Sequence, residues 1–260
     1  MLGNPGVGGG FSLQVGYQGA LEANLGVRKA MEDFLVVEPD VLGDGRFAAF
    51  VVLDGHGGGE VARRVKENFP RLFASALARG GGLGASVRLA VEMTSRMIES
   101  SRASNVGSTF CGLFVDRAAG ELVSANLGDS RLLRAWPGTF LTSEHKVSDP
   151  AEAARLWATG GKVLNGRVGG TLIVSRALGD LDARAFGLIA EPEILLLPPV
   201  KGLYAVASDG LWDRIDPPTF DRLATVYAGR PLAELASALV AAAVAAGSND
   251  NIALVLVNLQ

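Results

Sequence analysis

Aspartates at the ends of apolar segments are the residues in this chain best suited to chemistry. Asp54 follows the apolar run Phe47–Leu53, Asp209 follows Leu203–Ala207, and each has a glycine directly after it. Asp250 stands just before a third apolar run, near the end of the chain. Carboxylates gathered on one side of a sheet repel one another strongly unless a cation neutralises them. Because Mg²⁺ and Mn²⁺ prefer carboxylate, carbonyl and water oxygens, the pattern predicts a site for a hard divalent cation.

Three further acids share this arrangement. Asp129 lies in the turn Gly128–Ser130 between two expected strands, and Glu32 and Asp33 precede the apolar run Phe34–Val37. Taken singly, an Asp-Gly or Gly-Asp-Ser sequence is more often ordinary turn chemistry than a functional site, by about three to one. The prediction of a cation site therefore depends on how often the pattern recurs along the chain.

The composition excludes several classes of protein. The chain has 260 residues, 48% of them hydrophobic, which is enough to form a sizeable core and excludes global disorder. A net charge of −3 argues against a nucleic-acid binder, and no apolar run is long enough to cross a membrane. The single cysteine, Cys111, excludes a disulfide framework. Since residues 1–10 do not resemble a secretory signal, we expect an intracellular protein, cytoplasmic or nuclear.

The elements that position the acids can be read from hydrophobic periodicity. Strands are expected at 34–37, 47–53, 109–116, 122–125, 131–136, 194–197, 203–207 and 252–257. Helices are expected after Gly59, and at 85–101, 150–160, 217–227 and 232–246. The three strands between 109 and 136 follow one another with short turns, which suggests an antiparallel meander. Runs of strands separated by pairs of helices favour an α+β fold over regular βαβ alternation.

An ordered set of motifs along nearly the whole chain resembles the metal-dependent serine/threonine protein phosphatases of type 2C, the PPM type. The motifs are Arg28-Lys-Ala-Met-Glu32-Asp33, Val52-Leu-Asp54-Gly-His56-Gly-Gly58, Gly107-Ser-Thr109, Asn126-Leu-Gly-Asp129-Ser-Arg131, Leu141-Thr-Ser-Glu-His-Lys146, Val174-Ser-Arg-Ala-Leu-Gly-Asp180, Glu191-Pro-Glu193, Ser208-Asp-Gly-Leu-Trp-Asp213 and Asp250-Asn-Ile252. Any one of them is a modest signal, but the full set in this order is highly specific.

The resemblance implies a fold and an activity. The fold is a four-layer αββα sandwich, in which two antiparallel β-sheets pack together and a pair of helices flanks each. We expect a flexible N-terminal segment over residues 1–10 and a single catalytic domain over 11–260. The implied activity is hydrolysis of phosphoserine and phosphothreonine in phosphoprotein substrates, by a hydroxide that bridges two divalent cations, Mg²⁺ or Mn²⁺. No nucleic acid or membrane partner is expected, and the chain is expected to be a monomer.

The resemblance also assigns cation ligands residue by residue. Asp54 would bridge the two cations. The Gly55 carbonyl would ligate one of them, with Glu32 acting through a coordinated water. Asp209 and Asp250 would hold the other. Two such cations about 3.5–4 Å apart can lower the pKa of a bridging water and clamp a phosphoryl group.

Three more roles are carried over in the same way. Arg28 would bind the substrate phosphate, which its planar guanidinium fits with paired donors. His56 would be the general acid, because the alkoxide of serine or threonine is a poor leaving group without a proton. Without these neighbours, His56 would be an ordinary turn histidine and Arg28 a solvated surface residue. Asp129 matches a position that, in some members of the family, helps to hold a loosely bound third cation.

Three other functions compete with this prediction. Cys111 and Arg117 have the spacing of a cysteine-dependent phosphatase, but the residues between them form an apolar strand that cannot wrap a phosphate. An inactive relative acting as a binding module would have lost metal carboxylates, whereas Asp54 and its partners are present. A phosphoaspartyl hydrolase would need a second aspartate two residues after Asp54, where this chain has His56.

Overall fold

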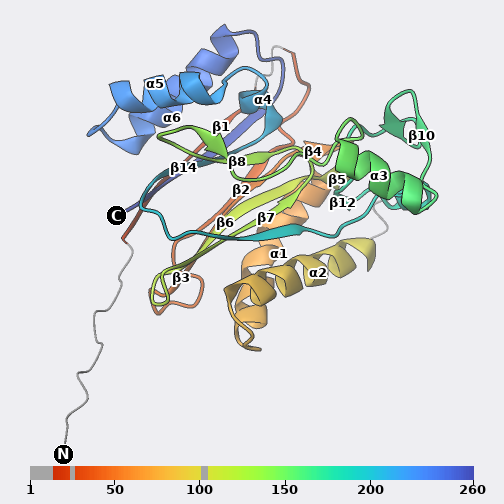
Figure 1. Ribbon diagram of the computed structural model, residues 1–260, viewed down its shortest axis with the longest axis horizontal. Coiled ribbons are helices and arrows are strands. Elements are labelled where there is room, and N and C mark those ends of the chain that lie inside the picture. The colour runs from red at the N-terminus through yellow and green to blue at the C-terminus, as the bar shows by residue number, and fades with distance from the viewer. Residues whose placement is uncertain (1–13, 24–26, 101–104) are drawn as a thin grey trace, which may run out of the picture.

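Two five-stranded antiparallel sheets form the centre of the molecule (Figure 1). This computed structural model describes residues 14–23, 27–100 and 105–260. The segment 1–10, for which the sequence predicts flexibility, lies outside these residues. Within the described ranges, no helix is both long and apolar enough to cross a membrane.

Each sheet combines strands from distant parts of the chain. The first has the order β13 (Glu193–Leu197), β7 (Glu121–Leu127), β6 (Phe110–Asp116), β3 (Phe47–Leu53) and β2 (Phe34–Glu38). The second has the order β1 (Val15–Glu22), β15 (Ile252–Leu259), β14 (Gly202–Ala207), β8 (Arg131–Arg134) and β9 (Thr139–Phe140). Asp54 follows β3 and Asp209 follows β14, so these two aspartates stand at strand ends in neighbouring sheets.

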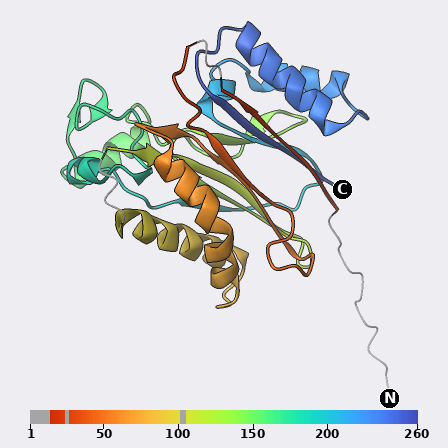
Figure 2. The same ribbon diagram turned by 180° about the vertical axis from the view of Figure 1, so that it is seen from behind.

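The helices cover the outer faces of the two sheets. On the first sheet lie α1 (Glu60–Leu77) and α2 (Leu83–Ser100), and on the second lie α4 (Asp209–Trp212), α5 (Pro217–Val226) and α6 (Leu232–Ala245). Figure 2 shows α1 and α2 in orange and ochre, on the opposite side of the sheets from the blue α5 and α6. The mixed α+β class with antiparallel sheets that the sequence predicts is confirmed.

Strand β3 shows why these segments are uniformly apolar. Its alternate residues Ala49, Val51 and Leu53 pack against α1 and α2, whereas Phe50 and Val52 pack into the layer between the two sheets. Successive side chains of a strand point to opposite faces, so a strand buried on both faces has to be apolar throughout. All seven residues of β3 are buried, and the chain after Leu53 is therefore held firmly where Asp54 begins.

A smaller sheet and a hairpin lie beside the main sheets. The small sheet has the order β12 (Leu178–Gly179), β5 (Gly107–Ser108) and β4 (Gly55–His56). The hairpin pairs β10 (Val163–Leu164) with β11 (Arg167–Val168), between α3 (Pro150–Ala158) and the 3₁₀ helix η1 (Leu181–Phe186). In Figure 1 these green and teal elements gather at the end of the molecule where β4 and β5 lie.

The expected meander is wrong for its third strand. β6 and β7 are paired as expected, but β8 pairs with β14 and β9 in the other sheet. The turn Gly128–Ser130 thus carries the chain from one sheet to the other. Gly128 has a φ of +96°, and a Cβ at this position would lie 2.7 Å from Thr109 Cγ2, so the crossing needs glycine.

Candidate active site

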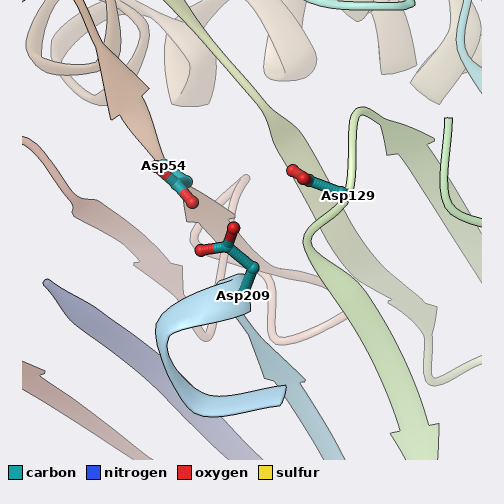
Figure 3. Close-up of side chains that lie close together, drawn as sticks. All are labelled: Asp54, Asp129 and Asp209. Atoms are coloured by element: carbon teal, nitrogen blue, oxygen red, sulfur yellow. The ribbon is translucent and has the colours of Figure 1, made fainter. Parts of the chain in front are cut away.

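Three aspartates from separate elements come together in space. Asp54 directly follows β3, Asp209 is the first residue of α4, and Asp129 lies in the crossing between β7 and β8. Each offers a carboxylate oxygen, and these atoms all lie within 4.8 Å of one another. Figure 3 shows the three side chains pointing toward a common point.

A short chain of hydrogen bonds ties two of these elements together. Thr109 accepts a bond from the Asp54 backbone N–H on its Oγ1 (3.1 Å) and donates its own N–H to the Asp54 carbonyl (2.9 Å). The same Oγ1 lies 2.8 Å from the hydroxyl oxygen of Ser130, the residue after Asp129. The end of β3 and the crossing between the sheets are thereby fixed relative to each other.

The carboxylates are in a setting that disfavours their negative charge. Burial raises the pKa of Asp209 to about 7, and the charges of Asp129 and Asp250 add to the shift. Burial also raises the pKa of Asp54 well above its usual value, followed in importance by repulsion from Asp33 and Asp209. Burial raises the pKa of Asp129 despite the ammonium of a neighbouring lysine. Such a cluster is stabilised by a bound cation.

One atom of the cluster supports a cation in particular. Asp209 Oδ1 is buried and has no hydrogen-bond partner among the described residues. A buried carboxylate oxygen without a partner loses solvation with nothing in exchange. All three side chains provide the oxygen ligands that Mg²⁺ and Mn²⁺ prefer. The residues present therefore fit a divalent cation at Asp54, Asp129 and Asp209.

Asp250 and Arg28 lie in the same cavity but are paired with each other. The Arg28 guanidinium forms an ion pair with the Asp250 carboxylate and donates from Nε to the carbonyl of Asn249 at 3.2 Å. Asp250 is not part of the group of three within 4.8 Å, although its charge acts on Asp209. The cavity has a volume of about 700 Å³ and is lined by both residues and by all three clustered aspartates.

Glu32 and Gly55 line this cavity side by side. The Glu32 backbone N–H donates to Asn251 Oδ1 at 3.0 Å, which anchors it to the chain beside Asp250. A Cβ at Gly55 would come within 2.4 Å of the Glu32 carbonyl oxygen, so this approach is possible only for glycine. The structure thus brings the two residues together, as the proposed ligand set requires.

His56 lies at the edge of the cavity and contacts a buried aspartate. Its Nε2 is 2.6 Å from Oδ2 of Asp180, whose side chain is 3% exposed compared with 26% for the histidine. Burial opposes the charged imidazolium, but the hydrogen bond and the charge of Asp180 outweigh it, and the pKa of His56 is raised. The ring therefore takes up a proton more readily than a free histidine does.

Cys111 and Arg117 do not form a phosphate-binding site. Cys111 lies within β6, is fully buried between the sheets, and has a thiol pKa that burial raises far above its usual value. Arg117 donates to the carbonyls of Gly45 and Pro39. A cysteine nucleophile needs an accessible thiolate, which Cys111 cannot provide.

Two buried acids beside the site received no individual role from the sequence. Asp33 is 2% exposed, accepts a hydrogen bond from Ser208 Oγ at 2.9 Å, and has a pKa that burial raises to about 7. Its position directly before β2 follows the strand-end pattern of Asp54, so that signal was present. Asp180 follows a strand of only two residues, too short for any periodicity to reveal.

Comparisons with known proteins agree with this geometry. The sequence model described as "Protein phosphatase 2C" matches residues 17–252. A rice protein named "Probable protein phosphatase 2C 32" is 32% identical over 90% of this chain and 63% of its own length, and a second, "Probable protein phosphatase 2C 59", is 31% identical over 98% of this chain and 80% of its own.

Solved structures show the same fold. A sex determining protein of C. elegans superposes with a TM-score of 0.86 at 27% identity, covering 94% of this chain and 64% of that one. Serine-threonine phosphatase 2C from Toxoplasma gondii has a TM-score of 0.77 at 23% identity, covering 94% and 95% of the two chains. This chain spans just under two thirds of the first rice relative and of the C. elegans protein. The chain belongs to the protein phosphatase 2C family.

Proposed function

We propose that this chain is a metal-dependent protein serine/threonine phosphatase. The observation that carries the proposal is the cluster of Asp54, Asp129 and Asp209, with its unpartnered buried oxygen, in a cavity that Arg28 and His56 also line. A cavity that joins cation ligands, a guanidinium and an imidazole suits a phosphate ester. The catalytic domain in this proposal is single and spans residues 11–260.

The cations would be held by the acids of the cavity. Asp54 is central in this assignment, with Asp209 and Asp250 on one side and the Gly55 carbonyl and Glu32 on the other. The carboxylate oxygens of Asp129 and Asp209 lie within 4.8 Å of each other, which supports a third, weaker cation position. Divalent cations bound there would supply a water of lowered pKa for attack on phosphorus and positive charge for the phosphoryl oxygens.

Arg28 would bind the substrate phosphate. Its side chain is 49% exposed, so the guanidinium is free to exchange the Asp250 carboxylate for phosphate oxygens. The planar guanidinium offers parallel N–H donors that match two oxygens at once. In this proposal the ester oxygen of the substrate faces His56, which lines the same cavity as Arg28.

His56 would donate the proton that the leaving group needs. A serine or threonine alkoxide is strongly basic, and a positioned acid typically accelerates its departure by about 10²–10⁴-fold. The charge of Asp180 favours the protonated ring that this role requires. The walls of the cavity also include Arg167 of the β10–β11 hairpin and the segment Leu172–Val174 that follows it, and these residues would contact the protein part of the substrate. That the protein is a monomer and that it acts inside the cell remain predictions from the sequence.

The test is release of phosphate from a phosphothreonine peptide by the whole chain. We expect turnover with Mn²⁺ or Mg²⁺, none in EDTA, and none in the variant D54N at any Mn²⁺ concentration below about 1 mM. Treatment with a thiol alkylator should leave the activity intact, since Cys111 is buried. Activity that survives EDTA, or that D54N retains, would refute the proposal.

A further inference from the structure

We infer that Asp180 is a positioning residue that holds the imidazole of His56 in the orientation and tautomer needed for proton donation. This inference rests on the proposed phosphatase function. Two nitrogens of a neutral imidazole have different roles, and the partner of one decides which of them carries the proton. The orientation of His56 is therefore set by the group that its ring contacts on the buried side.

The contact between His56 and Asp180 is short and uses only one of the two ring nitrogens. His56 Nε2 lies 2.6 Å from Asp180 Oδ2, slightly shorter than the ~2.7–2.9 Å of a typical charge-assisted N–H···O bond. A carboxylate can only accept, so Nε2 carries a hydrogen and donates it to Asp180. Because Asp180 is almost completely buried and His56 is not, the Nε2 edge of the ring faces the protein. Nδ1 is then the nitrogen left for the leaving oxygen of the substrate.

The backbone around Asp180 is built to hold this pair. Asp180 has a φ of +45°, a left-handed conformation that is unfavourable for most residues. Its N–H donates to the carbonyl of Val106 at 3.0 Å, and the preceding strand β12 pairs with β5, which in turn pairs with β4. His56 belongs to β4, so the small sheet brings the two side chains together although 124 positions separate them in sequence.

Gly107 in β5 gives independent support. A Cβ at Gly107 would lie 1.9 Å from Asp180 Oδ2 and 2.5 Å from His56 Nε2. The central strand of the small sheet thus passes directly over the hydrogen bond, and only a glycine leaves room for it. The small sheet is therefore shaped around this contact, which a chance surface ion pair would not require.

The role of Asp180 in the reaction follows from where each proton goes. Water supplies its hydroxyl to phosphorus, the bond from phosphorus to the ester oxygen breaks, and that oxygen takes the proton from Nδ1 of His56. The other proton of the water restores the ring. Throughout, Asp180 accepts the Nε2–H bond and stabilises the cationic ring, without itself touching the substrate.

The experiment uses D180N in the full chain, with D182N as the matched control. Asparagine tolerates the left-handed conformation of residue 180 and keeps its size, so the fold should survive. Asp182 is an exposed carboxylate two residues away. For D180N we expect kcat on a phosphothreonine peptide to fall about 10- to 100-fold with KM nearly unchanged, within the range a general acid supplies. Hydrolysis of p-nitrophenyl phosphate should fall less than about 3-fold, and D182N should match the parent.

A second measurement does not depend on activity. The chain has only two histidines, so ¹⁵N spectra of the imidazole rings can be assigned with the variant H56Q. We expect His56 to be the Nε2–H tautomer in the metal-free parent and in D182N, and to lose that single tautomer in D180N. An active parent whose D180N variant keeps both the tautomer and the peptide kcat would overturn the positioning role alone. A parent inactive on both substrates would overturn the proposed function, and the positioning role with it.

Discussion

Replacing His56 should lower the rate by an amount that depends on the leaving group of the substrate and not on cation binding. For H56Q we predict a loss of about 10²–10⁴-fold in kcat on a phosphoserine peptide, but a much smaller loss on p-nitrophenyl phosphate. The nitrophenolate ion is stable without a proton, whereas a serine alkoxide is not. The measurement is kcat on both substrates at saturating Mn²⁺, and equal fractional losses would remove His56 from the acid role.

Asp209 should matter for cation binding and not for folding. In D209N we predict that turnover is nearly abolished, while the melting temperature in EDTA is no lower than that of the parent. The amide keeps the shape of the side chain and relieves the repulsion from Asp129 and Asp250 that helps to raise the pKa of Asp209. Calorimetric melts of both proteins in EDTA test this, and a marked drop for D209N would mark Asp209 as a structural residue.

The sequence patterns predicted which acids stand at strand ends better than they predicted which side chains of the site contact one another. Asp54 and Asp209 stand out because long buried strands precede them. The ion pair of Arg28 with Asp250 and the bond of His56 to Asp180 have no such signal. Both depend on segments more than 120 positions apart, and a local pattern carries no information on which distant side chains meet.

Among the elements, α3 is held by a buried carboxylate whose loss should be measurable. Glu152 accepts hydrogen bonds from Arg176 (2.5 Å), Ser175 (2.6 Å) and Arg155 (3.0 Å). Burial opposes its charge, but these bonds outweigh burial and lower the pKa of Glu152 to about 2. They tie α3 to the chain that follows Leu172–Val174, which lines the cavity.

For E152Q we predict a loss of about 2–3 kcal/mol in the free energy of unfolding, less than the ~3–5 of a fully buried pair because both arginines are partly exposed. Since the folded pKa is below the unfolded value of 4.5, this stabilisation is present above pH 4.5 and is lost as the pH falls toward 2. Urea unfolding at pH 7 is the measurement. E60Q, which weakens an exposed pair with Arg64, is the control and should change stability by less than about 0.5 kcal/mol.

The sequence did not predict strands, or strand pairings, that depend on hydrogen bonds to a strand from a distant part of the chain. β1 (Val15–Glu22) contains two glycines and no long apolar run, yet it forms a full strand because it pairs along its length with the buried β15. β8 was expected in a meander, but its partner is β14 in the other sheet. Helices such as α1 were predictable because their apolar residues recur every three or four positions and face a single sheet.

On the scale of the whole molecule, the two sheets bring their acids together at a cost that cations should remove. The pKa values of Asp33 and Asp209 are raised from 3.8 to about 7, mainly by burial. Between pH 4 and 7 these two carboxyl groups bind more protons in the folded chain than in the unfolded chain, so they lower the free energy of unfolding as the pH rises through that window. His145, whose pKa burial lowers to about 4, acts in the opposite direction.

The prediction is that Mg²⁺ stabilises this protein more at pH 8 than at pH 5. At pH 5 protons occupy the acids and compete with the cation, whereas at pH 8 the carboxylates are ionised and only the cation relieves their repulsion. Melting temperatures with EDTA or with excess Mg²⁺, from pH 5 to pH 8, give the shift directly. D209N is the control, because it keeps His145 and loses one titrating ligand, so its Mg²⁺ shift should be smaller and depend less on pH. An equal Mg²⁺ shift at both pH values in the parent would contradict a cation site built from these buried acids.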